Sequence, residues 1–291
     1  ILNLGAVPIF VDIDKVSGSI LISDLIDKIS LNTKCIIVVH LFGNVGNIGS
    51  ISALAKSKKI MVLEDVSHAH GALYEGKKVG SFGDISCFSL QGAKAISAGE
   101  GGIALTDDER FLSLMSMYGH FGRHKHLFRA ENMKYQYTGV GHKLRANPLG
   151  IGMASIDLIF NDYYNKKARK NKTIFDKMFK NVEGITVMAS SQNGQSGGFF
   201  GGLPILIDPM LHSIDEVLGA FTNYGINVNR YPYQLHHKME IYNHDKGSTL
   251  INTEYLEKNL ILIDRRLLFY LPFTMKYAFR KVIKELSRIS L

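Results

Sequence analysis

Apolar residues recur along the first hundred positions in short runs separated by stretches of helical character. Val7–Asp12, Cys35–Val39 and Met61–Leu63 are apolar runs of strand length. Between them, residues 20–29 and 51–57 place apolar side chains at helical spacing. The second and third runs are typical of strands that are buried on both faces. This alternation predicts a mostly parallel sheet covered by helices.

The pattern changes after residue 110. A helix is predicted over 111–117, and a loop leads to an apolar helix over 149–158 and a basic helix beyond it. The remaining elements have α+β character: strands at 203–207 and 226–229, a helix that Ser213 and Glu216 open as a capping box, and an amphipathic helix over 277–288. We therefore expect a large domain over 1–160 and a small α+β domain over 161–291.

Composition is ordinary for a globular protein, with 46% hydrophobic and 21% charged residues among 291. No apolar run is long enough to span a bilayer, so we expect no membrane contact and a cytoplasmic location. Cys35 and Cys87 stand in apolar surroundings without metal-ligand spacing, which predicts buried, reduced thiols and no metal site. The chain begins with Ile1 rather than Met, and we expect it to be a fragment truncated at its N-terminus.

A formal charge of +8 raises the question of an anionic partner. The densest basic cluster, residues 166–172, has helical spacing and is typical of a solvated helix face. The sequence contains no zinc-finger spacing and no RNA-binding aromatic signature, so we expect no nucleic-acid partner. The positive field favours a phosphorylated small substrate, and nucleic-acid binding stays the alternative use of this surface.

One lysine lies in a loop of small residues after a predicted strand. Lys94 follows the strand at 85–90 and precedes the sequence Gly99-Glu-Gly-Gly102 and a strand at 102–105. Asp65 follows a neighbouring strand, with Glu64 as a competing carboxylate. A lysine can form a Schiff base with the aldehyde of pyridoxal phosphate, and a carboxylate can keep the pyridine nitrogen protonated. Each residue alone is more often a surface lysine or a turn aspartate.

Ordered motifs along nearly the whole chain carry a family resemblance. They are Gly5-Ala-Val-Pro-Ile-Phe-Val-Asp-Ile-Asp14, Val39-His-Leu-Phe-Gly43, Glu64-Asp-Val-Ser-His-Ala-His-Gly71, Val79–Asp84, Phe88–Gly102, His142–Leu149 and the weaker Arg230–His236. Together they resemble the DegT/DnrJ/EryC1/StrS aminotransferases, which use pyridoxal 5'-phosphate and act mostly on nucleotide-linked keto sugars. The resemblance implies the α/β fold of type I pyridoxal-phosphate transferases, similar to aspartate aminotransferase, with residues 1–160 forming the cofactor-binding domain.

The resemblance also implies roles for individual residues. Lys94 would be the Schiff-base lysine and would move protons between substrate and cofactor. Asp65 would pair with the pyridinium nitrogen, and Glu64 would have no such role. His68 would lie against the cofactor ring or its phenolic oxygen, and Ser89 would donate to the phosphate.

Three departures from the family pattern affect the phosphate site. The family's Gly-Thr loop and an early aromatic partner of the cofactor ring would precede residue 1. Ala93 stands where a hydroxyl residue is common. Lys143 and Arg145 stand in the loop where many members place an asparagine that reaches the phosphate from the neighbouring subunit. Either cation could bind the phosphate or could be a surface residue.

The implied activity is transfer of an amino group, typically from glutamate, to a keto sugar in the biosynthesis of cell-surface polysaccharides or secondary metabolites. Lys94 favours transamination, because members that catalyse dehydration carry histidine at this position. Gln91 resembles members that act on cyclitols or amino-hydroxybenzoate precursors, and a non-catalytic fragment that binds the cofactor is a further alternative. We expect a homodimer with a shared active site.

Overall fold

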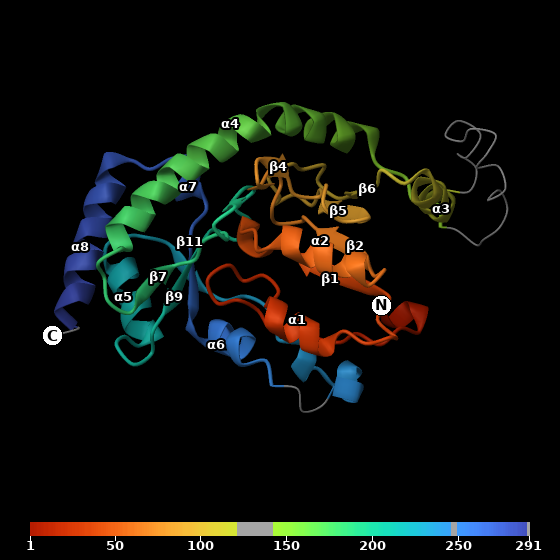
Figure 1. Ribbon diagram of the computed structural model, residues 1–291. Coiled ribbons are helices and arrows are strands. Elements are labelled where there is room, and N and C mark those ends of the chain that lie inside the picture. Colours follow the sequence, from red (N-terminus) through yellow and green to blue (C-terminus); the bar gives the residue numbers. More distant parts are fainter. Residues whose placement is uncertain (121–141, 246–248, 290–291) are drawn as a thin grey trace.

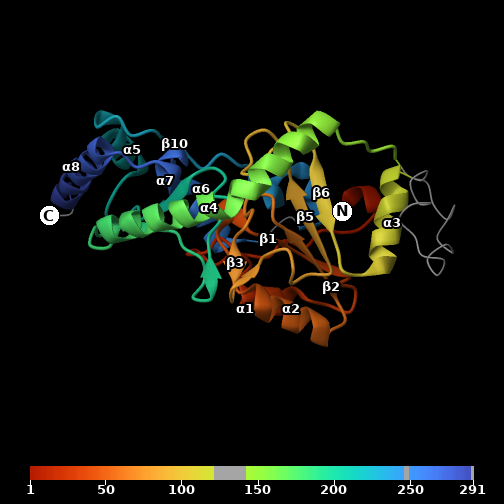
Figure 2. The same cartoon turned by 90° about the horizontal axis from the view of Figure 1, so that it is seen from above.

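Two four-stranded sheets lie at opposite sides of the molecule, and one long helix runs over both (Figure 1). The computed structural model describes residues 1–120, 142–245 and 249–289. The long helix, α4 (Pro148–Phe179), has 32 residues and arches from the first sheet to the second in both views (Figure 2). It begins where Asn147 accepts a hydrogen bond from Leu149 N and Pro148 occupies the first turn.

The first sheet contains the expected parallel strands. Its strands, in spatial order, are β1 (Cys35–Val39), β2 (Met61–Asp65), β5 (Ile85–Ser89) and β6 (Gly102–Leu105). The first three are parallel and β6 is antiparallel to β5. Helices α1 (Ile22–Lys28) and α2 (Ile48–Ser57) cover one face, where Ile36, Val38 and Ile51 belong to one apolar core. The predicted mostly parallel sheet is confirmed.

Some local predictions for this half are wrong. Residues 7–12 form no strand; Val7 and Ile9 are exposed, and the segment that follows pairs only through an isolated bridge between Ile13 and Ile20. Strand β1 is buried on one face rather than two, since Ile37 and Val39 are about 40% exposed.

Neither cysteine is a buried thiol. Cys35 is exposed and Cys87 is half-buried, although both are free, as expected. The prediction for Cys35 is wrong for the same reason as the one for β1: the apolar run Cys35–Val39 alternates between a buried face and an exposed face, and Cys35 lies on the exposed face.

The second sheet is antiparallel, in the order β10-β11-β9-β7. Its strands are β7 (Ile185–Val187), β9 (Leu203–Ile207), β10 (Val228–Arg230) and β11 (Leu260–Ile263). Helices α5 (Ile214–Asn223) and α8 (Phe273–Ile289) pack on it, and Phe221, Phe279 and α4 residue Phe175 share its core. The predicted capping box is confirmed, since Ser213 Oγ accepts from Glu216 N and the Glu216 carboxylate accepts from Ser213 N.

A small third sheet joins the two halves. Strand β3 (Leu73–Tyr74) pairs with β4 (Lys77–Lys78) and with β8 (Gly194–Gln195), which belongs to the chain just before β9. Among the described residues, the remaining elements are helices α3 (Glu109–His120), α6 (Ile251–Asn259) and α7 (Arg266–Phe269), together with the short 3-10 helices Leu2–Leu4, Leu41–Gly43, His236–Lys238 and Glu240–Asp245. Within the described ranges, no helix is long and apolar enough to cross a membrane.

Helix α4 merges two predicted helices into one. Its basic segment is not wholly solvated, because Lys172 is 7% exposed and pairs with Asp176 at 2.8 Å. The predicted domain boundary at 160/161 lies inside α4, and the division into 1–160 and 161–291 stays a prediction.

We predict that Asp12 stabilises helix α6 from a distant part of the chain. Its carboxylate accepts hydrogen bonds from Asn252 N and Thr253 N, which belong to the first turn of α6. Asp12→Ala leaves these donors without a partner, and the free energy of unfolding should fall by about 2 kcal/mol. Urea unfolding measures the loss. The exposed control Asp27→Ala should change stability by less than about 0.5 kcal/mol, and equal effects of the two variants would contradict the capping role.

Candidate active site

Four of the six predicted site residues gather where two parallel strands end. Asp65 is the last residue of β2 and Ser89 is the last residue of β5. The strands are neighbours with Asp65 in register with Cys87, so their carboxyl ends meet at one edge of the sheet. Lys94 lies in the turn after β5, and His68 lies in the turn after β2. Ligands of α/β sheets bind at such edges.

Lys94 is half-buried and its ammonium faces an aromatic ring. Nζ lies 3.5 Å from the centroid of Phe200, which belongs to the segment between β8 and β9. Burial lowers the pKa of Lys94, and the positive charge of Arg265 lowers it further, while the negative charge of Asp65 acts in the opposite direction. A lysine with a lowered pKa is more often neutral, and only the neutral amine is a nucleophile or a base.

Two histidines near Lys94 are held neutral. Burial lowers the pKa of His68 to about 4, and the charge of Lys94 adds to the effect. The pKa of His70 also falls to about 4, again mainly through burial. The ring of His68 lies 4.3 Å from that of Phe200, and its Nδ1 accepts a hydrogen bond from Phe42 N. Around neutral pH both rings are therefore uncharged.

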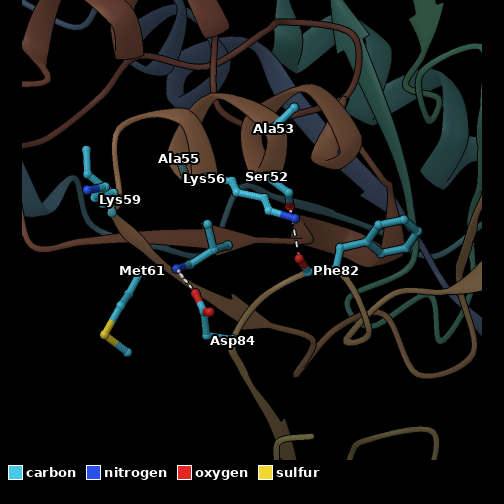
Figure 3. Close-up of a pocket in the computed structure, with 10 residues that line it drawn as sticks. Ser52, Ala53, Ala55, Lys56, Lys59, Met61, Phe82 and Asp84 are labelled. Carbon is cyan, nitrogen blue, oxygen red and sulfur yellow. Dashed lines mark hydrogen bonds between the residues drawn. The ribbon is translucent and has the colours of Figure 1, made fainter. Parts of the chain in front are cut away.

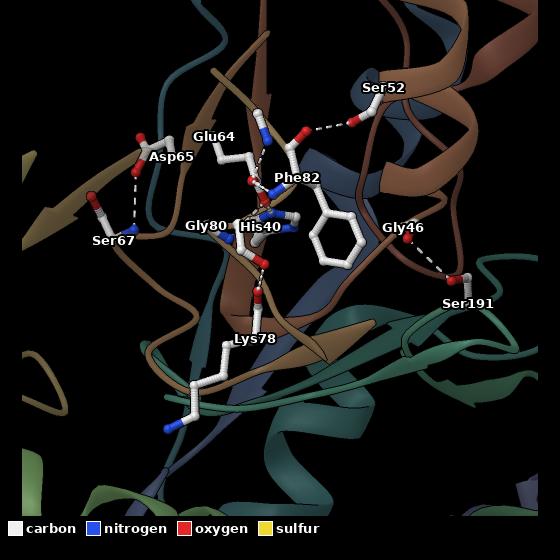
Figure 4. Close-up of polar contacts among 12 residues, drawn as sticks. His40, Gly46, Ser52, Glu64, Asp65, Ser67, Lys78, Gly80, Phe82 and Ser191 are labelled. Carbon is white, nitrogen blue, oxygen red and sulfur yellow. Dashed lines mark hydrogen bonds and ion pairs between the residues drawn. The ribbon is translucent and has the colours of Figure 1, made fainter. Parts of the chain in front are cut away.

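The two adjacent carboxylates have different surroundings (Figure 4). Glu64 is fully buried and accepts hydrogen bonds from the backbone N–H groups of Gly80, Phe82 and Gly83, and its Oε2 lies 3.1 Å from His40 Nε2. Burial alone would raise the pKa of Glu64, but these hydrogen bonds outweigh it and hold the pKa below its ordinary value. Asp65 is half-buried, and its Oδ1 accepts only from Ser67 N among the described residues. Asp65 is thus the carboxylate that is available to a ligand.

Residues 196–202 form a wedge between the two halves of the site. A Cβ atom on Gly198 would lie 2.7 Å from His68 O and from His70 N, and one on Gly202 would lie 2.1 Å from Ile263 O. Gly198 and Gly202 also have φ values of +70° and +120°, which favour glycine. No side chain fits at Gly198 or at Gly202, because its Cβ would clash with the neighbouring backbone. Phe200 lies between these two close contacts. The close packing therefore places Phe200 against Lys94 and His68.

Helix α4 joins the wedge to the turn that carries the histidines. The side chain of Asn165, which is 2% exposed, donates from Nδ2 to His70 O and accepts from Gly198 N through Oδ1, both at 2.8 Å. Asn161 also donates to His70 O, at 3.3 Å. Nearer its start, α4 holds the lysine loop, because Asp157 accepts a hydrogen bond from Ser97 N.

Lys143 and Arg145 are not brought into this cluster. Both are exposed and lie on the segment between α3 and α4, where Leu144 N donates to Gly119 O. No described contact joins either cation to Lys94, Asp65 or Ser89. Their predicted contact with the phosphate remains a prediction.

A surface hollow of about 500 Å³ lies elsewhere, between α2 and β2 (Figure 3). Lys56, Lys59 and Asp84 are among its lining residues, and none of the six predicted site residues is. In the described part of the chain, no cluster of histidine, cysteine or acidic residues could hold a metal ion.

Sequence reasoning assigned no role to three residues at this site: Phe200, Arg265 and His70. Phe200 follows a Gly-rich stretch, and Arg265 comes two residues after the apolar strand β11. The signal that could have identified Arg265 is its place in a charged pair directly after a buried strand, because ligands often bind at the ends of strands. Phe200 is placed by long-range packing and has no comparable local signal.

The fold agrees with solved structures of aminotransferases and of a dehydratase. Helicobacter pylori PseC, an aminotransferase of pseudoaminic acid biosynthesis, superposes with a TM-score of 0.81 at 23% identity over 99% of this chain and 76% of that chain. The structure of an E. coli GDP-4-keto-6-deoxy-D-mannose-3-dehydratase with bound hydrated PLP superposes with a TM-score of 0.77 at 22% identity. The match covers 97% of this chain and 73% of that chain. The type I fold expected from the sequence is confirmed.

Sequence comparison identifies the family. The DegT/DnrJ/EryC1/StrS aminotransferase family matches residues 1–266, and the protein belongs to it. A GDP-perosamine synthase of Escherichia coli O157:H7 is 36% identical over 183 residues, which are 62% of this chain and 47% of that protein. The chain spans about half the length of this and other curated relatives.

We predict that Glu64 stabilises the folded state only in its charged form. Its folded pKa is lowered from 4.5, so its contribution is complete above pH 4.5 and is lost as the pH falls through the folded pKa. Glu64→Gln should lower the free energy of unfolding at pH 7 by about 3 kcal/mol, because an amide NH₂ would face backbone donors. Urea unfolding between pH 3 and 7 measures both effects. The exposed control Glu100→Gln should match the parent protein, and a parent-like Glu64→Gln would disprove the assignment.

We predict that Asn165 holds the wedge against the histidine turn. Asn165→Leu removes both the donor to His70 O and the acceptor for Gly198 N, so the free energy of unfolding should fall by about 2–4 kcal/mol. Hydrogen exchange should show faster exchange at Gly198 N than in the parent. The exposed control Asn223→Leu should leave the exchange at Gly198 unchanged, whereas unchanged exchange in Asn165→Leu would contradict the proposed contact.

Proposed function

We propose that this protein is a pyridoxal-phosphate-dependent aminotransferase that transfers an amino group from glutamate to a keto sugar, which we take to be nucleotide-linked. The observation that carries the proposal is the meeting of Lys94 and Asp65 at one sheet edge in a member of this family. The named relatives supply the substrate class, since a GDP-perosamine synthase is among them.

The residues present fit the cofactor. The negative charge of Asp65 acts to raise the pKa of Lys94, but no ion pair joins the two side chains among the described contacts, so each is available to a ligand. Ser89 lies at the same edge, and its Oγ accepts only a 3.3 Å hydrogen bond from Gln91 N among the described contacts. His70 Nε2 is buried and has no partner within the described residues. An amine, a carboxylate, a hydroxyl and neutral rings are the groups that pyridoxal phosphate requires.

In this proposal Lys94 would bind the aldehyde and would then carry a proton to and from the substrate carbon, for which its lowered pKa suits it. Asp65 would hold a proton on the pyridine nitrogen. Ser89 would donate to the phosphate, and the neutral His68 would lie against the ring together with Phe200. When bound, the cofactor supplies an electron sink for the carbanion that proton removal creates.

The dehydratase neighbour shows that this fold alone does not select the reaction. We assign transamination because the residue at the turn is Lys94, whose amine can accept the cofactor's aldehyde. Because Gln91 resembles members that act on cyclitols or amino-hydroxybenzoate precursors, a substrate of that kind is the second candidate. Its side chain accepts from Ala93 N and so shapes the lysine turn, which gives it a local structural use as well.

We further propose a cytoplasmic homodimer in which Lys143 and Arg145 of each subunit reach the other subunit's phosphate site. Both side chains are exposed cations, which suits a charge-assisted contact across an interface. Light scattering should give the mass of a dimer. Replacement of both cations should weaken cofactor binding without unfolding the protein, and a monomeric active enzyme would contradict the arrangement.

The intact protein should gain a visible absorbance band on addition of pyridoxal phosphate, and borohydride should remove it. Lys94→Ala should lack the band, and Lys58→Ala, an exposed control, should keep it. Beyond one equivalent per active site, the loaded enzyme should form 2-oxoglutarate from glutamate only when a nucleotide-linked keto sugar is present. A protein that stays colourless would overturn the proposal, and turnover with a cyclitol ketone alone would favour the second candidate.

We predict that Asp65→Asn lowers turnover by about 100-fold or more and leaves folding intact, because an amide cannot hold the pyridine nitrogen protonated. Turnover and circular dichroism measure the two effects. Asp162→Asn, an exposed change on α4, should leave both unchanged. An Asp65→Asn enzyme of normal turnover would show that another residue performs this task.

A further inference from the structure

Phe200 has a fixed place beside the lysine turn. It belongs to the wedge, and its backbone N–H donates to His68 O at 3.5 Å. Gly198 and Gly202 on either side of it pack so closely against neighbouring backbone that neither could carry a side chain. The centroid of the Phe200 ring also lies 4.3 Å from that of His68. Backbone and ring contacts together therefore fix the direction in which this aromatic ring points.

One face of the Phe200 ring is turned toward the amine of Lys94. Nζ lies 3.5 Å from the ring centroid, well inside the range of about 6 Å in which a cation and an aromatic ring attract each other. The attraction acts on the ammonium form, because the face of the ring carries partial negative charge. An aromatic face needs no opposite charge for this, so the carboxylate of Asp65 stays available to a ligand.

Two charged groups and two neutral rings also act on Lys94 or lie near it. Burial lowers the pKa of Lys94, the charge of Asp65 opposes this change, and the charge of Arg265 adds to it. His68 and His70 have pKa values of about 4 and are uncharged around neutral pH. The aromatic ring favours the charged amine and so acts in the same direction as Asp65. A substitution of the ring leaves these four residues in place, and its own effect can be measured.

We propose that Phe200 is a positioning residue that holds the amine of Lys94 at the edge of the site whenever this amine is not bonded to the cofactor; this inference rests on the function proposed above. A lysine side chain has four rotatable bonds, and contact with the ring restricts them. The amine is free before it binds the aldehyde and again while it carries a proton to and from the substrate carbon. At both stages the ring keeps the amine close to the atoms that it must reach next.

The test compares Phe200→Leu and Phe200→Tyr with the exposed control Phe273→Leu. Leucine keeps an apolar side chain of similar size and removes the aromatic face, whereas tyrosine keeps the face. Competitive labelling of the full chain with trace acetic anhydride over a range of pH, followed by mass spectrometry of the Lys94 peptide, measures the pKa of Lys94 and needs no cofactor. Phe200→Leu should lower this pKa by about 0.5–1 pH unit, and the other two variants should match the parent.

Two results of the labelling would overturn the inference. One is a pKa of Lys94 that is unchanged or raised in Phe200→Leu. The other is an equal fall of this pKa in Phe200→Tyr, because the change would then come from altered packing and not from the aromatic face.

The rate at which the visible band forms on addition of pyridoxal phosphate gives a second, separable result. Only the neutral amine attacks the aldehyde, so well below the measured pKa of Lys94 the Phe200→Leu protein should form the band about 3- to 10-fold faster than the parent. Well above that pKa the two rates should be equal. Equal acceleration at every pH would overturn the inference, since it would show easier access to Lys94. If the parent forms no band but Phe200→Leu still lowers the pKa of Lys94, the proposed function fails and the contact between the two residues remains.

Discussion

The arrangement of the site depends on one buried side-chain amide, that of Asn165. Asn165 on α4 donates to His70 O and accepts from Gly198 N, and so connects the turn after β2 to the wedge that precedes β9. Each of these backbone groups would otherwise be buried without that partner. The wedge places Phe200 against Lys94, and Gly202 at its end packs against the backbone of Arg265. Without this connection, the first sheet would hold Lys94 and Asp65 without the second half of the site.

A second constraint separates two neighbouring carboxylates. Successive side chains on a strand point to opposite faces, so Glu64 and Asp65 at the end of β2 meet different surroundings. Glu64 faces inward and holds the backbone of residues 80–83, whereas Asp65 faces the site. The rigid inner carboxylate fixes the strand end on which the outer one is presented. The buried carboxylate of Glu64 thus stabilises the strand end that presents the carboxylate of Asp65 to the site.

Local patterns were sufficient to predict the elements that need no distant partner. The β1, β2 and β5 strands, the Ser213–Glu216 capping box and the placing of Asp65 and Lys94 at strand ends are confirmed. The strand at 7–12 was wrong because Asp12 is bound by α6, about 240 positions away. Phe200 and Arg265 were missed for the same reason. Their positions follow from contacts between segments that are far apart in sequence, and no local periodicity encodes such contacts.

The central claim is that Lys94 is the residue that binds the cofactor covalently. Borohydride reduction of the loaded protein, followed by proteolysis and mass spectrometry of the peptides, tests it most directly. The pyridoxyl group should be found on the peptide that contains Lys94, at one group per chain. A group attached to any other lysine, with the Lys94 peptide unmodified, would contradict the claim.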